Sequence, residues 1–178
     1  MVGLIATDGN LGRQKPVITI VSKDVDMLET VRRCLGLTTP MRKHHGGYGH
    51  HCSHLSWQDR AFYEWLYEIG LRPAKSLTLR PLAVPDRYFV DFFRGCIDGD
   101  GSVLVYTDRY HDAKCERYVY ERLYLSIVSA SGSFIEWLRT TVNRLTNVKG
   151  SIGVRQRPGT HPLWKLRYAK EESIQLLR

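Results

Sequence analysis

The chain has 178 residues, of which 43% are hydrophobic and 11% aromatic, and a formal net charge of +8. This composition excludes a disordered chain, and the length allows one ordinary domain or two small halves that share a core. Because no apolar run is long enough to span a membrane and no secretory signal peptide is visible, we expect a soluble intracellular protein of the cytoplasm or an organelle. The excess of Lys and Arg favours a polyanionic partner.

The first half of the chain predicts five elements. The chain opens with a helical run over 1–9, followed by a short two-stranded element over 9–22 and a helix over 24–36. A hairpin around the letters GGYG is predicted over 40–56, and another helix over 56–70. Asp24 suits the start of the first complete helix, and Ser56 or Asp59 is the predicted cap of the next. The segment LRPAKSLTLRPLAVPD then joins the halves, and a new helix is predicted from Pro85.

The second half predicts the same order of elements. After the new helix come two strands, over 103–110 and 119–129, and a helix over 132–145. A hairpin over 150–169 and the start of a last helix over 171–178 follow. Ser133 or Ser131 is the predicted cap of the middle helix. The chain starts inside its opening helix and stops where its last helix would be half built. We therefore expect it to be a piece of a longer protein.

The two halves also match residue by residue. At an offset of 92 the opening stretch MVGLIATDGNL superimposes on FRGCIDGDGSV, which pairs Gly3 with Gly95, Ile5 with Ile97, Asp8 with Asp100 and Gly9 with Gly101. Further along, TIVSKDVDMLETV matches SIVSASGSFIEWL at an offset of 107, so the second repeat carries 107 − 92 = 15 extra residues in its first hairpin. The sequence predicts an α+β fold with one repeat over 1–82, a linker over 83–86 and a second repeat over 87–178.

Two aspartates occupy matching places at the ends of the two motif helices. Small residues four apart allow these helices to pack closely about a pseudo-twofold axis, at Gly3 with Thr7 and at Gly95 with Gly99. Such packing would bring Asp8 and Asp100 side by side, where like charge and both helix dipoles favour a bound cation such as Mg²⁺. The alternative is that each Asp-Gly pair is only a turn. Asp98 has Ala6 as its counterpart, so we expect it to be structural or to act outside the ligand set.

The stretches GLIATDG and RGCIDGDG resemble the two motifs of single-chain LAGLIDADG homing endonucleases. The resemblance implies two αββαββα repeats whose motif helices form the interface, with an antiparallel β saddle over double-stranded DNA that is cut across the minor groove. It also implies that Asp8 and Asp100 bind two or three divalent ions, Mg²⁺ with Mn²⁺ tolerated. By the same resemblance, Lys75 in PAKS matches the active-site lysine, and Lys23 lies where a polar residue orders water. The counterpart of Lys23 is Ala130, which suggests unequal cleavage centres.

Positive charge is concentrated in the predicted hairpins. Residues 9–23, 41–58 and 148–170 contain no acidic residue. Candidate DNA-binding residues from these segments are Arg13, Lys15, Arg42, Lys43, Arg155, Gln156, Arg157, Lys165 and Arg167. Solvated hairpins with incidental charge are the alternative. The segment 106–122 is neutral overall, so it reads bases through hydrogen bonds or lies off the DNA.

The stretch HHGGYGHHCSH also raises the possibility of a zinc site. Its spacing matches no standard zinc finger, and alternation along a strand would put His50, Cys52 and His54 on one face. We therefore favour a DNA-facing hairpin at these residues.

Together with the resemblance, these observations favour a monomeric, Mg²⁺-dependent, site-specific DNA endonuclease, and the resemblance implies that a mobile intron or intein encodes it. Two other interpretations stay open. One is a DNA-binding regulator that keeps this fold without cutting, and the other is an intron maturase that binds structured RNA.

Overall fold

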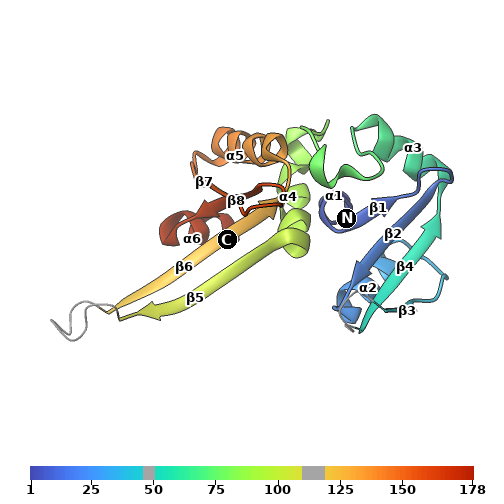
Figure 1. Cartoon of the computed structure of the whole chain (residues 1–178), viewed down its shortest axis with the longest axis horizontal. Coiled ribbons are helices and arrows are strands. Elements are labelled where there is room, and N and C mark those ends of the chain that lie inside the picture. Colours follow the sequence, from blue (N-terminus) through green and yellow to red (C-terminus); the bar gives the residue numbers. More distant parts are fainter. Residues whose placement is uncertain (46–50, 110–118) are drawn as a thin grey trace. The chain divides into compact units, whose positions relative to one another are not determined.

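The computed structural model describes residues 1–45, 51–109 and 119–178 (Figure 1). The chain is α+β, with two four-stranded antiparallel sheets, and it divides into two compact units over Met1–Gly99 and Asp100–Arg178. The α+β fold with two copies of one arrangement, predicted from the sequence, is confirmed. The helix that follows the linker belongs to the first compact unit up to Gly99.

Unit 1 contains the first copy and the second motif helix. Its elements are α1 (Val2–Thr7), β1 (Gly9–Leu11), β2 (Val17–Ser22), α2 (Val25–Cys34), β3 (Arg42–His45), β4 (His51–Gln58), α3 (Arg60–Glu68), the 3₁₀ helix η2 (Lys75–Leu77) and α4 (Asp86–Asp100). The strand order is β1-β2-β4-β3. Ile18, Ile20 and Leu55 are fully buried on the face of the sheet against which α2 and α3 pack, so the opposite face is the open one.

Unit 2 has the same topology. Its elements are β5 (Gly101–Asp108), β6 (Tyr120–Ser129), α5 (Gly132–Thr146), β7 (Ser151–Arg155), β8 (Leu163–Tyr168) and α6 (Lys170–Leu177). The strand order β5-β6-β8-β7 repeats that of unit 1. Leu125, Ile127 and Leu166 are fully buried on the face against which α5 and α6 pack.

The two copies share details of local structure at the offset of 107. Asp24 caps α2 by accepting a hydrogen bond from the Met27 amide at 2.9 Å. Its counterpart Ser131 caps α5 through the Phe134 amide at 3.3 Å. Matched ion pairs follow in the two helices, Glu29 with Arg32 and Glu136 with Arg139. Such agreement in caps and ion pairs is what a duplicated sequence predicts.

The structure chooses between the predicted caps and corrects one element boundary. Asp59 is the cap of α3, because Ser56 lies inside β4. The cap of α5 is Ser131 and not Ser133, which lies within the helix. The first strand of the second repeat begins at Gly101 and not at residue 103, since α4 continues to Asp100 and leads directly into β5.

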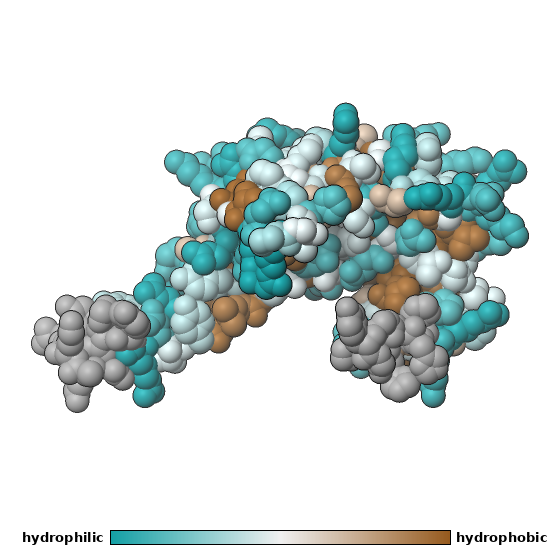
Figure 2. All heavy atoms as spheres, viewed as in Figure 1, coloured by the Kyte–Doolittle hydropathy of each residue, from teal (hydrophilic) through white to brown (hydrophobic). Residues whose placement is uncertain are grey.

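Exposed apolar side chains gather on β5, as Figure 2 shows. Val103, Leu104 and Val105 are exposed by 49%, 53% and 69%. Among the described helices, none is long and apolar enough to cross a membrane.

Candidate cleavage centre and nucleic-acid interface

Helix α1 packs backbone to backbone against α4. A Cβ atom added at Gly3 would overlap the Phe92 carbonyl oxygen and would lie 2.7 Å from the Cys96 amide nitrogen. A Cβ atom on Gly95 would lie 3.0 Å from the Leu4 amide nitrogen. Both distances are shorter than ordinary van der Waals contact, so only glycine fits at this crossing. The close approach that the small residues predict is therefore present within unit 1.

Asp8 lies at the carboxyl end of this crossing. It is the C-cap residue of α1, and its amide donates to the Leu4 carbonyl at 2.9 Å. One carboxylate oxygen of Asp8 lies 3.3 Å from the position of a Cβ atom on Gly99, in the last turn of α4. Asp100 is the next residue along the chain and the last of that helix. The strands β1 and β5 start at Gly9 and Gly101, so a strand follows directly after each aspartate.

Lys75 reaches the same end of α1 from a distant part of the sequence. Ala74 precedes it in the left-handed conformation, with a φ angle of 55°, and η2 begins at Lys75 itself. The Lys75 side chain is buried, with 6% exposure, and its ammonium group donates a hydrogen bond to the Gly9 carbonyl oxygen. Because a buried ammonium group needs such partners, this contact places a positive charge one residue from Asp8.

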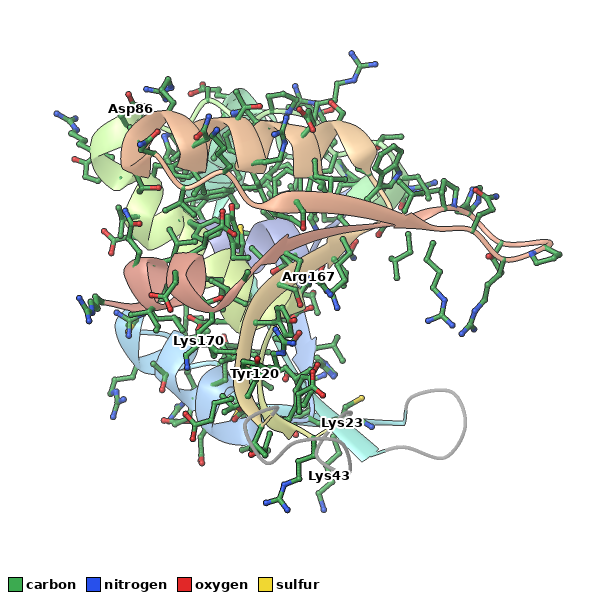
Figure 3. The ribbon with its side chains drawn as sticks, turned by 90° about the vertical axis from the view of Figure 1, so that its left-hand side faces the viewer. Lys23, Lys43, Asp86, Tyr120, Arg167 and Lys170 are labelled. Carbon is green, nitrogen blue, oxygen red and sulfur yellow. The ribbon has the colours of Figure 1, made fainter. Side chains whose placement is uncertain are left out.

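Lys23 follows the end of β2 and is exposed. The register pairs Gly9 with Ile20, so Lys23 lies beyond the end of the sheet where β1 begins. Ser22 pairs with Ser53, which pairs with Lys43, so the two lysines share that end of the sheet (Figure 3).

The turn between β1 and β2 carries Arg13 and Lys15, both exposed. The Tyr63 hydroxyl of α3 donates a hydrogen bond of 2.7 Å to the Gly12 carbonyl oxygen and fixes the start of this turn. Tyr63 is thus a positioning residue that sequence reasoning missed. No local pattern could have indicated it, because the two partners are 51 residues apart.

The register decides which candidate cations of β3 lie on the open face. Arg42 pairs with His54, and His54 pairs with Val21. These residues lie on the open face of the sheet, opposite the face of the buried Ile20. Lys43 alternates to the other face, at its exposed end.

In unit 2 the open face carries cations on neighbouring strands. Lys165 and Arg167 of β8 pair with Val128 and Ser126, which alternate with the buried Ile127. Arg155 ends β7. Gln156 and Arg157 follow in the exposed β7–β8 connection, where the Thr160 amide donates to the Arg157 carbonyl at 3.1 Å.

Part of the sequence-based predictions lies outside the described residues. This applies to His50, to the side chains of His44, His45 and His51, and to residues 110–118 of the long hairpin. Over the side chains that the structure does describe, no group of three or more His, Cys, Asp or Glu is placed to hold a metal ion.

Comparison with known proteins identifies the fold through structure alone. No protein-family model and no curated protein sequence matches the chain. Among solved structures, the homing endonuclease I-WcaI bound to its DNA recognition sequence has a TM-score of 0.62 at 12% identity, covering 98% of this chain and 76% of the other. A variant of I-DmoI, solved in complex with its target DNA in the presence of Mn, has a TM-score of 0.61 at 13% identity, covering 99% and 88%.

A third similar structure is full-length DUF199/WhiA from Thermatoga maritima, with a TM-score of 0.61 at 14% identity, covering 99% of this chain and 51% of that one. The fold is therefore not confined to proteins named as endonucleases. The chain has the fold of the single-chain LAGLIDADG homing endonucleases, as the doubled motif predicts.

Proposed function

We propose that the chain is a site-specific double-strand DNA endonuclease of the homing type. It acts as a monomer whose two repeats replace the two subunits of a dimer, in the cytoplasm or in an organelle that carries its mobile intron or intein. Support comes from the fold, which it shares with homing endonucleases solved with their DNA targets. The basic segments of its hairpins add to this support, because DNA is recognised first through its phosphates.

The observation that carries the proposal is the position of Asp8 in the α1–α4 crossing. Its carboxylate lies beside Gly99, and the second aspartate of the doubled motif follows at Asp100. Both aspartates end helices, where the dipole adds negative potential, so the chemistry of these donors fits divalent cations.

Asp8 and Asp100 would hold two or three Mg²⁺ ions, with Mn²⁺ as a substitute. Such ions, when bound, lower the pKa of water and stabilise charge on phosphate oxygens.

Two lysines of unit 1, Lys75 and Lys23, supply positive charge in addition to that of the metal ions. The Gly9 carbonyl oxygen accepts a hydrogen bond from the Lys75 ammonium group, at the residue that follows Asp8. In this position the ammonium group stabilises negative charge that develops on the scissile phosphate. Lys23, exposed at the end of β2, orders water at one cleavage centre, and Ala130 leaves the other centre without this group.

A DNA-binding protein that does not cut is the alternative, favoured by the likeness to DUF199/WhiA. An RNA-binding maturase is the other interpretation of the same basic surface. The presence of both aspartates at matched helix ends favours the endonuclease.

The experiment is a selection from a randomised duplex library incubated with the protein and Mg²⁺, followed by sequencing of newly formed ends. We expect one family of sites cut on both strands, with short 3′ overhangs. Binding of selected duplexes without new ends would support the non-cutting regulator. Preferential binding of structured intron RNA over duplex DNA would support the maturase.

A further inference from the structure

The open face of each sheet has a first row of side chains immediately after the motif helix. In unit 2 this first row crosses the strands through Ser102, Ser126, Arg167 and Ser151. In unit 1 the equivalent row contains Asn10, Thr19 and Ser56. Each row starts two residues after the aspartate of its motif. Side chains in the first row therefore belong to the part of the sheet nearest the proposed cleavage centre.

The two rows differ in charge at one position. In unit 1 the Thr19 hydroxyl lies 2.7 Å from the Ser56 hydroxyl on the neighbouring strand β4. Ser126, which matches Thr19, instead lies 3.0 Å from the Ser102 hydroxyl on β5. Its neighbour on β8, at the place of Ser56, is Arg167. In the first repeat, this position carries a hydroxyl group that is paired with another hydroxyl of the same sheet. In the second repeat, the same position carries an arginine.

The ring of Tyr124 lies against Arg167, and the ring of Tyr106 lies next to that of Tyr124. The guanidinium carbon lies 4.6 Å from the centroid of the Tyr124 ring, and the Tyr106 ring centroid lies 6.3 Å from that of Tyr124. Stacking occupies the flat face of the guanidinium group and leaves its in-plane N–H donors available. Figure 3 shows Arg167 on the side of β8 opposite α5.

Within the described part of the chain, the charge of Arg167 has no acidic partner. No carboxylate of the described residues forms an ion pair with it, and its side chain is exposed. Further along the same face Arg122 is paired with Asp108 at 3.1 Å. Among the described residues of this face, Arg167 on β8 therefore offers a positive charge to a ligand, whereas Arg122 on β6 is already paired.

We infer that Arg167 reads a guanine in the half-site bound by the second repeat, at a base pair close to the cleaved positions. The inference rests on the proposed function and specifies its substrate. A two-stranded ribbon fits the major groove, where an arginine fork donates to O6 and N7 of guanine. Because Ser56 stands at the matched position, the first repeat lacks this contact, and the two half-sites are read unequally there.

The test is a selection of bound duplexes from a randomised library with the full chain and three variants. Arg167→Ala removes the donors, Arg167→Lys keeps the charge without the fork, and Arg60→Ala removes an exposed arginine on α3, away from the sheet face. Circular dichroism confirms that each variant is folded.

We expect the wild-type chain and the Arg60→Ala variant to select guanine at one inner position, with about ten- to a hundred-fold preference over other bases. Both Arg167 variants should lose the preference for guanine at this position and keep the base preferences at the other positions.

A uniform loss of affinity in Arg167→Ala that Arg167→Lys restores, with every base preference intact, would mean a phosphate contact and would overturn the inference. Failure of the wild-type chain to select any duplex would overturn the proposed function and this inference with it.

Discussion

At the residue scale, the candidate site depends first on glycines, whose lack of a side chain allows close packing. Gly3 and Gly95 let the backbones of α1 and α4 meet, and Gly99 leaves room for Thr7 and the Asp8 carboxylate. A methyl group at these places would push the helices apart and move Asp8 away from the end of α4. The glycines therefore set the geometry on which the proposed metal ligands depend.

Replacing Gly3 by alanine tests this packing. We expect Gly3→Ala to lower the free energy of unfolding by about 1–3 kcal/mol, because the added Cβ meets backbone atoms that cannot rotate away. Gly153→Ala is the matched control, since nothing lies within 4 Å of an added Cβ there. Urea denaturation measures both variants. Equal stabilities of the two would contradict the packing described.

The role proposed for Lys75 predicts different effects on DNA cleavage and on DNA binding. We expect Lys75→Met to lower the cleavage rate by about a hundred-fold or more, because the phosphate loses a positioned positive charge. Affinity for the selected duplex should change little, since Lys75 is buried and does not contribute to the exposed basic surface. Single-turnover cleavage and gel-shift binding measure the two effects. A parallel loss of both would contradict the role given to Lys75.

Some single residues can be predicted from the sequence and others cannot. Asp8 and Asp100 follow from their matching places in a repeated motif. Lys75 is predicted only through the family resemblance, because its hydrogen bond to Gly9 joins residues 66 apart. Tyr63 is missed for the same reason. Local patterns carry no information about such long-range contacts.

At the scale of elements, helix caps show the duplication most clearly. We expect Ser131→Ala to lower the free energy of unfolding by about 1 kcal/mol, because the Phe134 amide loses its partner. Ser133→Ala, in the first turn of the same helix, should have little effect. Thermal denaturation compares the two variants, and a larger effect of Ser133→Ala would contradict the cap seen in the structure.

The sheet of unit 2 contains a buried tyrosine that makes stability depend on alkaline pH. Burial raises the pKa of the Tyr168 phenol, and the negative charge of Glu172 raises it further, while Arg139 acts in the opposite direction. The folded state therefore keeps the neutral phenol above about pH 10, where the unfolded chain ionises. Its stability contribution is complete below about pH 10 and is lost as the pH rises toward the folded pKa.

We expect the wild-type chain to lose about 1.4 kcal/mol more per pH unit above about pH 10 than Tyr168→Phe. Urea denaturation between about pH 9 and 11 measures the difference, with each protein compared with its own stability at the lower pH. Identical pH profiles would contradict the buried, neutral phenol.

Element boundaries show where sequence patterns are less informative. Hydroxyl and carboxylate side chains near each helix start leave two caps possible, and only the backbone geometry decides for Asp59 and Ser131. The start of β5 at Gly101 is also predicted too late, because glycine weakens a strand pattern even where the register needs it.

At the scale of the whole molecule, the duplication is the feature that the sequence predicts best. Two constant offsets give the same order of elements twice, and the two sheets have the same strand order. In the function proposed, the differences between the copies determine the specificity. Lys23 and Ala130 differ in charge at one matched position, and Ser56 and Arg167 at another. A duplicated chain can therefore recognise and process an asymmetric site that a symmetric dimer could not.

The central claim is that Asp8 and Asp100 together bind the metal ions that cleave DNA. The most direct measurement is linearisation, in Mg²⁺, of a plasmid that carries the selected site. We expect the wild-type chain to give linear product and both Asp8→Asn and Asp100→Asn to lower its rate by about a hundred-fold or more while binding is retained. Asp98→Asn changes an exposed neighbour whose counterpart in the first repeat is Ala6, and this variant should cleave normally. Undiminished cleavage by either of the first two variants would contradict the account.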